Sequence, residues 1–267
     1  MYPIGNNNKA ISYNFIKTKT NPYKNMKFFY IKLCAILLLS FYTSHAQEKI
    51  TGDGFEETID YTYDSDDNII KAVSTEDGTS ETTTFEYSGG RLATAYDGFT
   101  ESTFIYPSGS NTPERINTKE DGVSVSYAIL TSENGRITKI ENHNTTDGDV
   151  IEDVLFITYD ADGNVESAEG QEYNEDSEEF TTTLELSNVI TDGKKNPYAT
   201  SFAFFLQNED NPVSLGVSNV VSATVTLNGI GTPYASSFEY NSDNFPTSAS
   251  STVLGFSNTT DFTYNCK

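Results

Sequence analysis

The chain has 267 residues, with 16 Lys and Arg against 39 Asp and Glu, and a formal net charge of −23 at pH 7. Nucleic acids and anionic lipid surfaces bind clustered basic side chains, so this charge argues against both as partners. Cationic and neutral partners stay open, because spread acidic residues usually form no more than a solvated surface.

The first 46 residues are organised as a leader. Residues 1–25 hold four lysines, no acidic residue and no usable hydrophobic period. Met26 then opens a short basic stretch, and the apolar run 33–42 that follows is too short to cross a bilayer as a helix. Ser-His-Ala at 44–46 has the small-x-small form of a cleavage site. We therefore predict a signal peptide over 26–46 and a translation start at Met26, which makes residues 1–25 a non-native extension.

Cleavage near Ala46 would leave residues 47–267 as a single all-β domain with no transmembrane segment. The leader holds six lysines and no acidic residue, so its removal leaves 10 basic and 39 acidic residues and a net charge of −29. We expect it in the periplasm, at the cell surface or outside the cell. Cys34 lies within the apolar run rather than after it, so we do not expect a lipidated cysteine. Cys266 would then be alone and unable to form an internal disulfide, so we expect it to be a bystander at a strand end.

A hairpin phrase recurs through this domain. Its form is aromatic-x-aromatic, a polar turn of four or five residues, and an aliphatic residue, as in Tyr61–Ile70. Alternation suits a half-buried strand, and Asp and Asn suit the turn. No dozen-residue window shows a clear helical period, so we predict an all-β antiparallel meander of consecutive hairpins, forming a large curved sheet or a partly open barrel. The further copies occupy 85–92, 104–109, 130–137, 156–165, 238–247 and, as a half copy, 262–265.

One segment interrupts this rhythm. The apolar run 202–206 lies between two Asn-Pro steps, at 196–197 and 211–212, which mark turns. It could be a buried strand or a short helix that plugs an end of the sheet.

Along the strands the outward positions are Thr, Ser, Glu and Asp, which disfavours a lipid-embedded barrel with its alternating apolar band.

Residues that carry chemistry are scarce. His143, the one histidine after the leader, lies in the turn-like stretch Glu141–Asn144, and we expect a solvated side chain that nothing orients. Zinc ligands are nearly absent, and no G-x-S-x-G, HExxH, phosphate-loop or dinucleotide motif occurs. Paired carboxylates cannot be judged, because among 39 acids some pair fits any spacing. We therefore name no catalytic, cofactor-binding or metal-binding residue and expect no cofactor.

A calcium site is a more specific hypothesis than a carboxylate pair. Asp160–Asn164 places side-chain oxygens at alternate positions around Gly163, but a full calcium loop needs more ligands and a distal bidentate acid. The alternative, which the turn preferences favour, is a hairpin turn that uses Asp and Asn to bond its own backbone.

Two resemblances add to this interpretation. The copies at Tyr63-Asp64, Tyr159–Val165 and Tyr240-Asn241 resemble the tyrosine-aspartate (YD) repeats of secreted Rhs and teneurin-like shells, over about ten residues each. Residues 50–267 resemble secreted and lipoprotein domains of unknown function from Bacteroidetes with a porin-like β fold. That resemblance rests on the YD turns, on Lys195–Tyr198 with Asn211-Pro212, and on Phe245–Ser248 with Phe262–Tyr264.

The second resemblance implies a curved antiparallel sheet and no established activity. The chain departs from it in lacking a lipidation cysteine after the leader, which puts surface anchoring in doubt. Three classes of function stay open. They are a non-enzymatic binding or scaffold module of the cell envelope, which we favour, an accessory protein for glycan capture, and a carboxylate-based hydrolase. An envelope protein or a glycan is the expected partner, and the oligomeric state is open.

Overall fold

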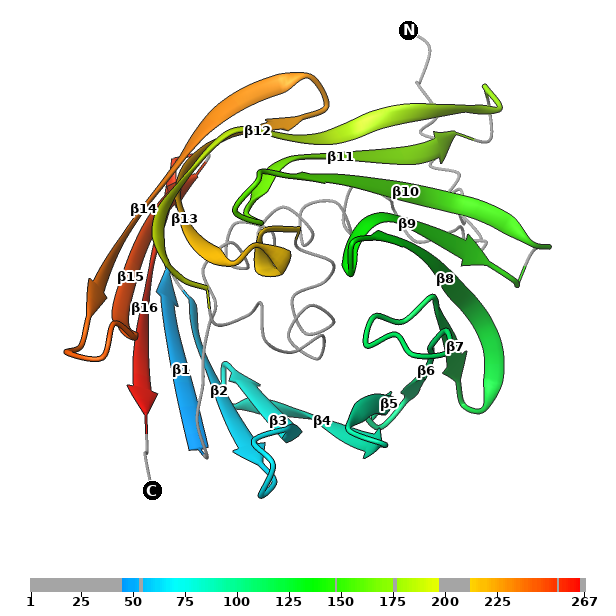
Figure 1. The fold of residues 1–267 in the computed structure, drawn as a ribbon, viewed down its shortest axis with the longest axis horizontal. Helices are drawn as coiled ribbons and strands as arrows, with labels where there is room; N and C mark the ends of the chain where they lie inside the picture. The colour runs from blue at the N-terminus through cyan, green and yellow to red at the C-terminus, as the bar shows by residue number, and fades with distance from the viewer. Residues whose placement is uncertain are drawn as a thin grey trace, which may run out of the picture.

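The computed structural model describes residues 45–52, 55–146, 148–174, 177–196, 212–253 and 255–264. Sixteen antiparallel strands and one short 3-10 helix, η2, occupy these ranges, and each strand pairs with its neighbours in the sequence (Figure 1). The predicted all-β meander is confirmed. The elements are β1 (His45–Gly52), β2 (Phe55–Tyr63), β3 (Ile69–Glu76), β4 (Thr79–Ser88), β5 (Arg91–Tyr96), β6 (Thr100–Ile105), β7 (Arg115–Glu120), β8 (Val123–Glu133), β9 (Arg136–Asn144), β10 (Val150–Tyr159), β11 (Val165–Asn174), β12 (Glu179–Lys195), η2 (Pro212–Leu215), β13 (Ser218–Leu227), β14 (Ile230–Tyr240), β15 (Pro246–Val253) and β16 (Phe256–Tyr264).

The barrel is closed rather than partly open. β1 pairs with β2 on one side and with β16 on the other, so that Ile50 lies opposite both Glu57 and Thr260. Closure removes the two unpaired edges that an open sheet of this length would expose.

The barrel encloses an apolar cluster. One cluster of buried hydrophobic side chains takes members from every strand between β1 and β15, and residues spread around the whole ring can meet only inside it. η2 lies within the ring (Figure 1), and Val213 joins the same cluster. Barrels of sixteen strands are usually too wide to be filled by strand side chains alone, and η2 adds Val213 to the side chains inside this one.

The outer wall is polar. On β15, Ala249, Ser251 and Val253 are buried, whereas the alternate residues Ser250 and Thr252 are exposed. Cross-strand hydrogen bonds and ion pairs link other outward side chains, such as Gln47 to Asp60 at 2.8 Å and Lys119 to Glu101 at 3.1 Å. Membrane-spanning barrels have the reverse arrangement, with an apolar outer band and a polar lumen.

The meander gives the barrel two distinct ends. The end that we call the base carries the turns of the repeated phrase, at Asp64–Asn68, Gly89-Gly90, Asn134-Gly135, Asp160–Asn164 and Asn241–Phe245. The opposite end, which we call the rim, carries turns such as Asp77-Gly78 and Asp121-Gly122. In both of these the two residues have positive φ, as two-residue hairpin turns require.

Consecutive hairpins are linked at the base by arginine and tyrosine. The Arg91 guanidinium lies 4.8 Å from the ring of Tyr106, whose hydroxyl donates to the Leu92 carbonyl at 2.9 Å. Arg136 and Tyr159 repeat this arrangement at 5.4 Å, with Tyr159 donating to the Ile137 carbonyl at 2.9 Å. The return strand of one hairpin is thereby attached to the first strand of the next.

Of the segment that interrupts the hairpins, the structure describes the two ends, Asn196 and the residues from Pro212 onward. Asn196 is buried and donates through Nδ2 to the carbonyls of Val213 and Gly216, at 3.1 and 2.7 Å. The apolar run 202–206, predicted as a strand or a plugging helix, lies outside the described residues, as do Cys34, Cys266 and the leader up to residue 44. Among the described residues, no helix is long and apolar enough to cross a membrane.

Candidate functional site

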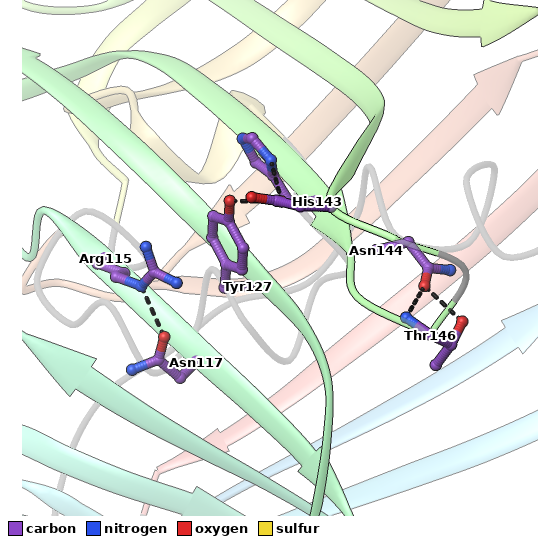
Figure 2. Close-up of polar contacts among 7 residues, drawn as sticks. Arg115, Asn117, Tyr127, His143, Asn144 and Thr146 are labelled. Carbon is purple, nitrogen blue, oxygen red and sulfur yellow. Dashed lines mark hydrogen bonds and ion pairs between the residues drawn. The ribbon is translucent and has the colours of Figure 1, made fainter.

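The outer wall carries a stack of aromatic and charged side chains on β7, β8 and β9 (Figure 2). Tyr127 and His143 are cross-strand neighbours, and their rings stack with centroids 4.3 Å apart. Asp149 accepts the Tyr127 hydroxyl hydrogen at 2.6 Å and lies 3.1 Å from His143 Nδ1. The Arg115 guanidinium packs over the ring of Tyr127, 3.7 Å from the ring centroid.

This placement corrects the sequence-based expectation for His143. It lies in β9 rather than in a turn, because β9 continues to Asn144 by pairing with both β8 and β10. Tyr127 and Asp149 also orient it, although they are 16 residues before and 6 residues after it in the sequence.

One hydrogen bond of the stack shifts the pKa values of both its partners. The hydrogen bond from Tyr127 lowers the pKa of the Asp149 carboxyl below its usual value, and the same bond raises the pKa of the Tyr127 hydroxyl. Asp149 is therefore an ionised acceptor shared by a phenol and an imidazole. Among the described residues, no hydrogen bond joins His143 to a Ser, Thr or Cys, so the nucleophile contact of a catalytic triad is not formed there.

A groove of about 580 Å³ lies beside the rim, on the outer wall. Tyr96 and Phe99 form its apolar part, with about half of each side chain exposed. The loop between them is held in shape: Tyr96 donates to the Gly98 carbonyl at 2.7 Å, and Asp97 Oδ1 accepts the N–H groups of Phe99 and Thr100. The other lining residues are Ser80, Glu81, Thr82 and Thr84.

The repeated hairpin phrase of the sequence did not predict this groove. The missed signal was the pair of aromatic residues on either side of the Asp97-Gly98 turn.

The stretch Asp160–Asn164 is built as a turn. Asp160 Oδ1 accepts the N–H groups of Asp162 and Asn164, at 2.9 and 2.8 Å, and Oδ2 accepts Asn164 Nδ2 at 2.9 Å. These bonds, led by that from the Asn164 side chain, lower the pKa of Asp160. Asp64 makes the same three bonds in the first copy. The structure thus shows the backbone-bonding role that the turn preferences favoured.

Nothing in the described ranges adds a metal centre to this turn, since no group of three or more His, Cys, Asp or Glu side chains there could hold an ion. At the same turn, Gly163 has φ of 90°, and a Cβ at this position would come within 1.9 Å of the Arg136 guanidinium. The turn therefore also receives the arginine of the preceding hairpin.

One carboxyl pair is relevant to hydrolase chemistry. Asp153 and Glu172 face each other across β10 and β11, and burial raises the pKa of Asp153, which accepts a hydrogen bond from Asn142 Nδ2 at 2.7 Å. A glycosidase needs its two carboxyl groups on either side of a cleft. The groove beside the rim is lined by residues from Ser80 to Phe99, and a second of about 310 Å³ by residues from Ser88 to Tyr106, so neither contains this pair.

No protein-family model matches the chain, and no curated protein matches it in sequence. Solved structures do match. A porin-like protein from Bacteroides uniformis ATCC 8492 is 12% identical with a TM-score of 0.57, covering 83% of this chain and 96% of its own. A porin-like protein from Bacteroides vulgatus ATCC 8482 is 11% identical with a TM-score of 0.44, covering 85% of this chain and 100% of its own.

At such low identity, the likeness to the Bacteroides uniformis protein establishes the fold alone. It agrees with the porin-like β fold that the second resemblance implied. The likeness to YD repeats has no matching family model and stays a prediction.

Proposed function

We propose that this chain is an exported, non-enzymatic binding module of the cell envelope, whose barrel stands in water rather than in lipid. The observation that carries the proposal is the direction of its polarity. Side chains of fifteen consecutive strands join one apolar cluster inside the barrel, whereas outward positions carry Ser, Thr and ion pairs. Placing that wall in hydrocarbon would leave charged groups without water, which costs several kcal/mol for each group near the bilayer centre.

Export fits the same interpretation. A signal peptide cleaved after Ala46 would remove the first two residues of β1 and leave Gln47–Gly52 to pair with β2 and β16. Six residue pairs to each neighbour would then remain, enough to keep the barrel closed. The scarcity of groups suited to catalysis, together with the aromatic stack and the groove on the outer wall, supports binding over chemistry.

Fractionation of a bacterium that expresses the full chain tests this proposal. We expect a mature protein that begins at Gln47 by mass spectrometry and stays in the supernatant after ultracentrifugation without detergent. A protein that is found in the membrane pellet and needs detergent for release would refute the water-exposed barrel. A cytoplasmic protein that still carries residues 26–46 would refute export.

Glycan capture is the second candidate, and the groove beside the rim favours it. Tyr96 and Phe99 offer aromatic faces of the kind that stack on sugar rings, while Glu81, Asp97, Thr82 and Thr84 surround them with acceptors and hydroxyls. Pockets that combine apolar surface with a few converging polar groups are the usual places for small ligands.

A melting series with soluble envelope oligosaccharides checks this candidate. A saccharide at a hundred times its Kd should raise the stability of the folded state by about 2.7 kcal/mol. Tyr96→Ala should raise the Kd for the saccharide at least tenfold and so reduce the gain in stability. Phe156→Ala removes an exposed aromatic from the outer wall away from the groove and should leave the affinity unchanged. If no saccharide shifts the melting curve, or if both variants behave alike, the groove is not a glycan site.

A further inference from the structure

The rim carries a ring of exposed apolar side chains. In an antiparallel meander all even-numbered strands begin at the same end, and here that end is the rim. Large apolar residues stand at or within one residue of five of these starts, and another precedes β6 directly. They are Phe99, Val123, Val150, Phe180, Ile230 and Phe256, and between 36% and 71% of each is exposed.

The turns themselves do not require these residues. A two-residue turn needs Asp, Asn or Gly at its centre, and the position that follows can hold a polar side chain, as Thr79 does at the start of β4. Of the other exposed large apolar residues, Tyr96 lies beside the rim in the groove, and the rest are scattered over the wall and the base. A monomer in water gains nothing from collecting apolar groups at one end, and apolar groups gathered in this way are typical of surfaces that contact a partner.

The charge of the same end restricts the partner. Exposed acids occupy the rim turns, among them Asp77, Asp97, Asp121 and Glu178. The two lysines nearest to this end are already paired, Lys49 with Glu56 at 2.8 Å and Lys119 with Glu101 at 3.1 Å. A second copy of the chain would bring like charges together, and an anionic bilayer would be repelled.

We propose that the rim docks a basic amphipathic segment of another protein, with its apolar side chains on the ring and its Lys or Arg side chains on the turn acids. This inference rests on the proposed binding function and names the surface and the chemistry of the partner. The apolar contacts supply the fit, and the acids set the orientation and speed the encounter.

A synthetic peptide of leucine and lysine with helical periodicity is a suitable probe, measured by fluorescence anisotropy against the full mature protein. A peptide with serine in place of leucine and the same charge controls for simple attraction to an acidic protein. We expect the leucine peptide to bind at least tenfold more tightly than the serine peptide. Its affinity should fall at least tenfold in the triple variant Val123→Ser, Ile230→Ser, Phe256→Ser.

A matched triple variant, Ile70→Ser, Ile105→Ser, Ile190→Ser, removes exposed apolar groups away from the ring and should change the affinity less than twofold. Far-UV circular dichroism checks that both variants fold. Equal binding of the two peptides, or equal loss in the two variants, would overturn the proposal. Co-sedimentation with phosphatidylcholine vesicles would also overturn it, because the ring would then bind lipid. So would a dimer that dissociates only in the rim variant, because the ring would then bind a second copy of the chain. Because export and water solubility are measured separately, failure here leaves the proposed function standing.

Discussion

Replacing Ile50 with alanine should lower the free energy of unfolding by about 2–5 kcal/mol. Ile50 is fully buried on β1, the strand that closes the barrel, and it faces Thr260 on β16 and Glu57 on β2. Truncation would leave a cavity at the seam, next to strands whose pairing cannot relax without opening the ring. Urea unfolding followed by far-UV circular dichroism measures the loss.

Thr51 is the matched control, because it is the next residue on the same strand and points outward. Thr51→Ala should change the free energy of unfolding by less than about 0.5 kcal/mol. If Thr51→Ala is as damaging as Ile50→Ala, the assignment of the inner and outer faces of β1 is wrong. If neither variant is affected, β1 does not close the barrel.

The second large effect is alkaline destabilisation. Burial raises the pKa of Tyr106 and that of Tyr159 to about 12, even though the guanidinium beside each acts to lower it. Both hydroxyls donate to backbone carbonyls at the base, and a phenolate could not donate. Burial also raises the pKa of Tyr234 and Tyr240.

The sign follows from linkage. In the unfolded chain these phenols ionise near pH 10, whereas the folded state keeps them neutral to about pH 12. The stability they contribute is therefore fully present below pH 10 and lost as the pH rises toward 12. Each contributes up to about 2 kcal/mol after allowance for partial exposure. Urea midpoints at pH 8, 10 and 11.5 should fall steeply over the last interval.

Tyrosine absorbance near 295 nm gives an independent reading, made simpler by the absence of tryptophan. We expect part of the tyrosine signal to appear late and together with loss of circular dichroism. Tyr159→Phe should reduce the alkaline loss while costing about 1 kcal/mol at pH 8, where its hydrogen bond is gone. Ionisation of every tyrosine near pH 10 without unfolding would contradict the buried hydroxyls.

The base of the barrel could be predicted because its information is local. Asp160 and Asn164 lie four residues apart, and their side chains bond the same short turn that the sequence predicts. Closure could not be predicted, because the contact between Ile50 and Thr260 joins residues far apart in the chain and neither carries a pairing signal. His143 was misplaced for a related reason. The strands on both sides of β9 extend it past the polar residues that, taken alone, indicate a turn.

The groove and the ring at the rim were missed for a different reason. Alternation in a strand separates the two faces of a sheet, but it does not say which residues near a turn are covered by a neighbouring hairpin. Tyr96 and Phe99 become a groove only when β4 and the start of β6 are placed beside them. Such features depend on the arrangement of several hairpins, and one sequence does not fix that arrangement by pattern alone.

The pairing of β1 with β16 also has a consequence for how the chain acquires its structure. Neighbouring hairpins, tied by Arg91 with Tyr106 and by Arg136 with Tyr159, can form in order as the polypeptide emerges. The first strand must wait for a partner roughly two hundred residues away, which is the slowest kind of contact to establish. Until then both outer strands offer free N–H and C=O groups to other chains. A delay before the last strand is available should therefore make aggregation, rather than loss of any single hairpin, the main failure in the folding of this protein.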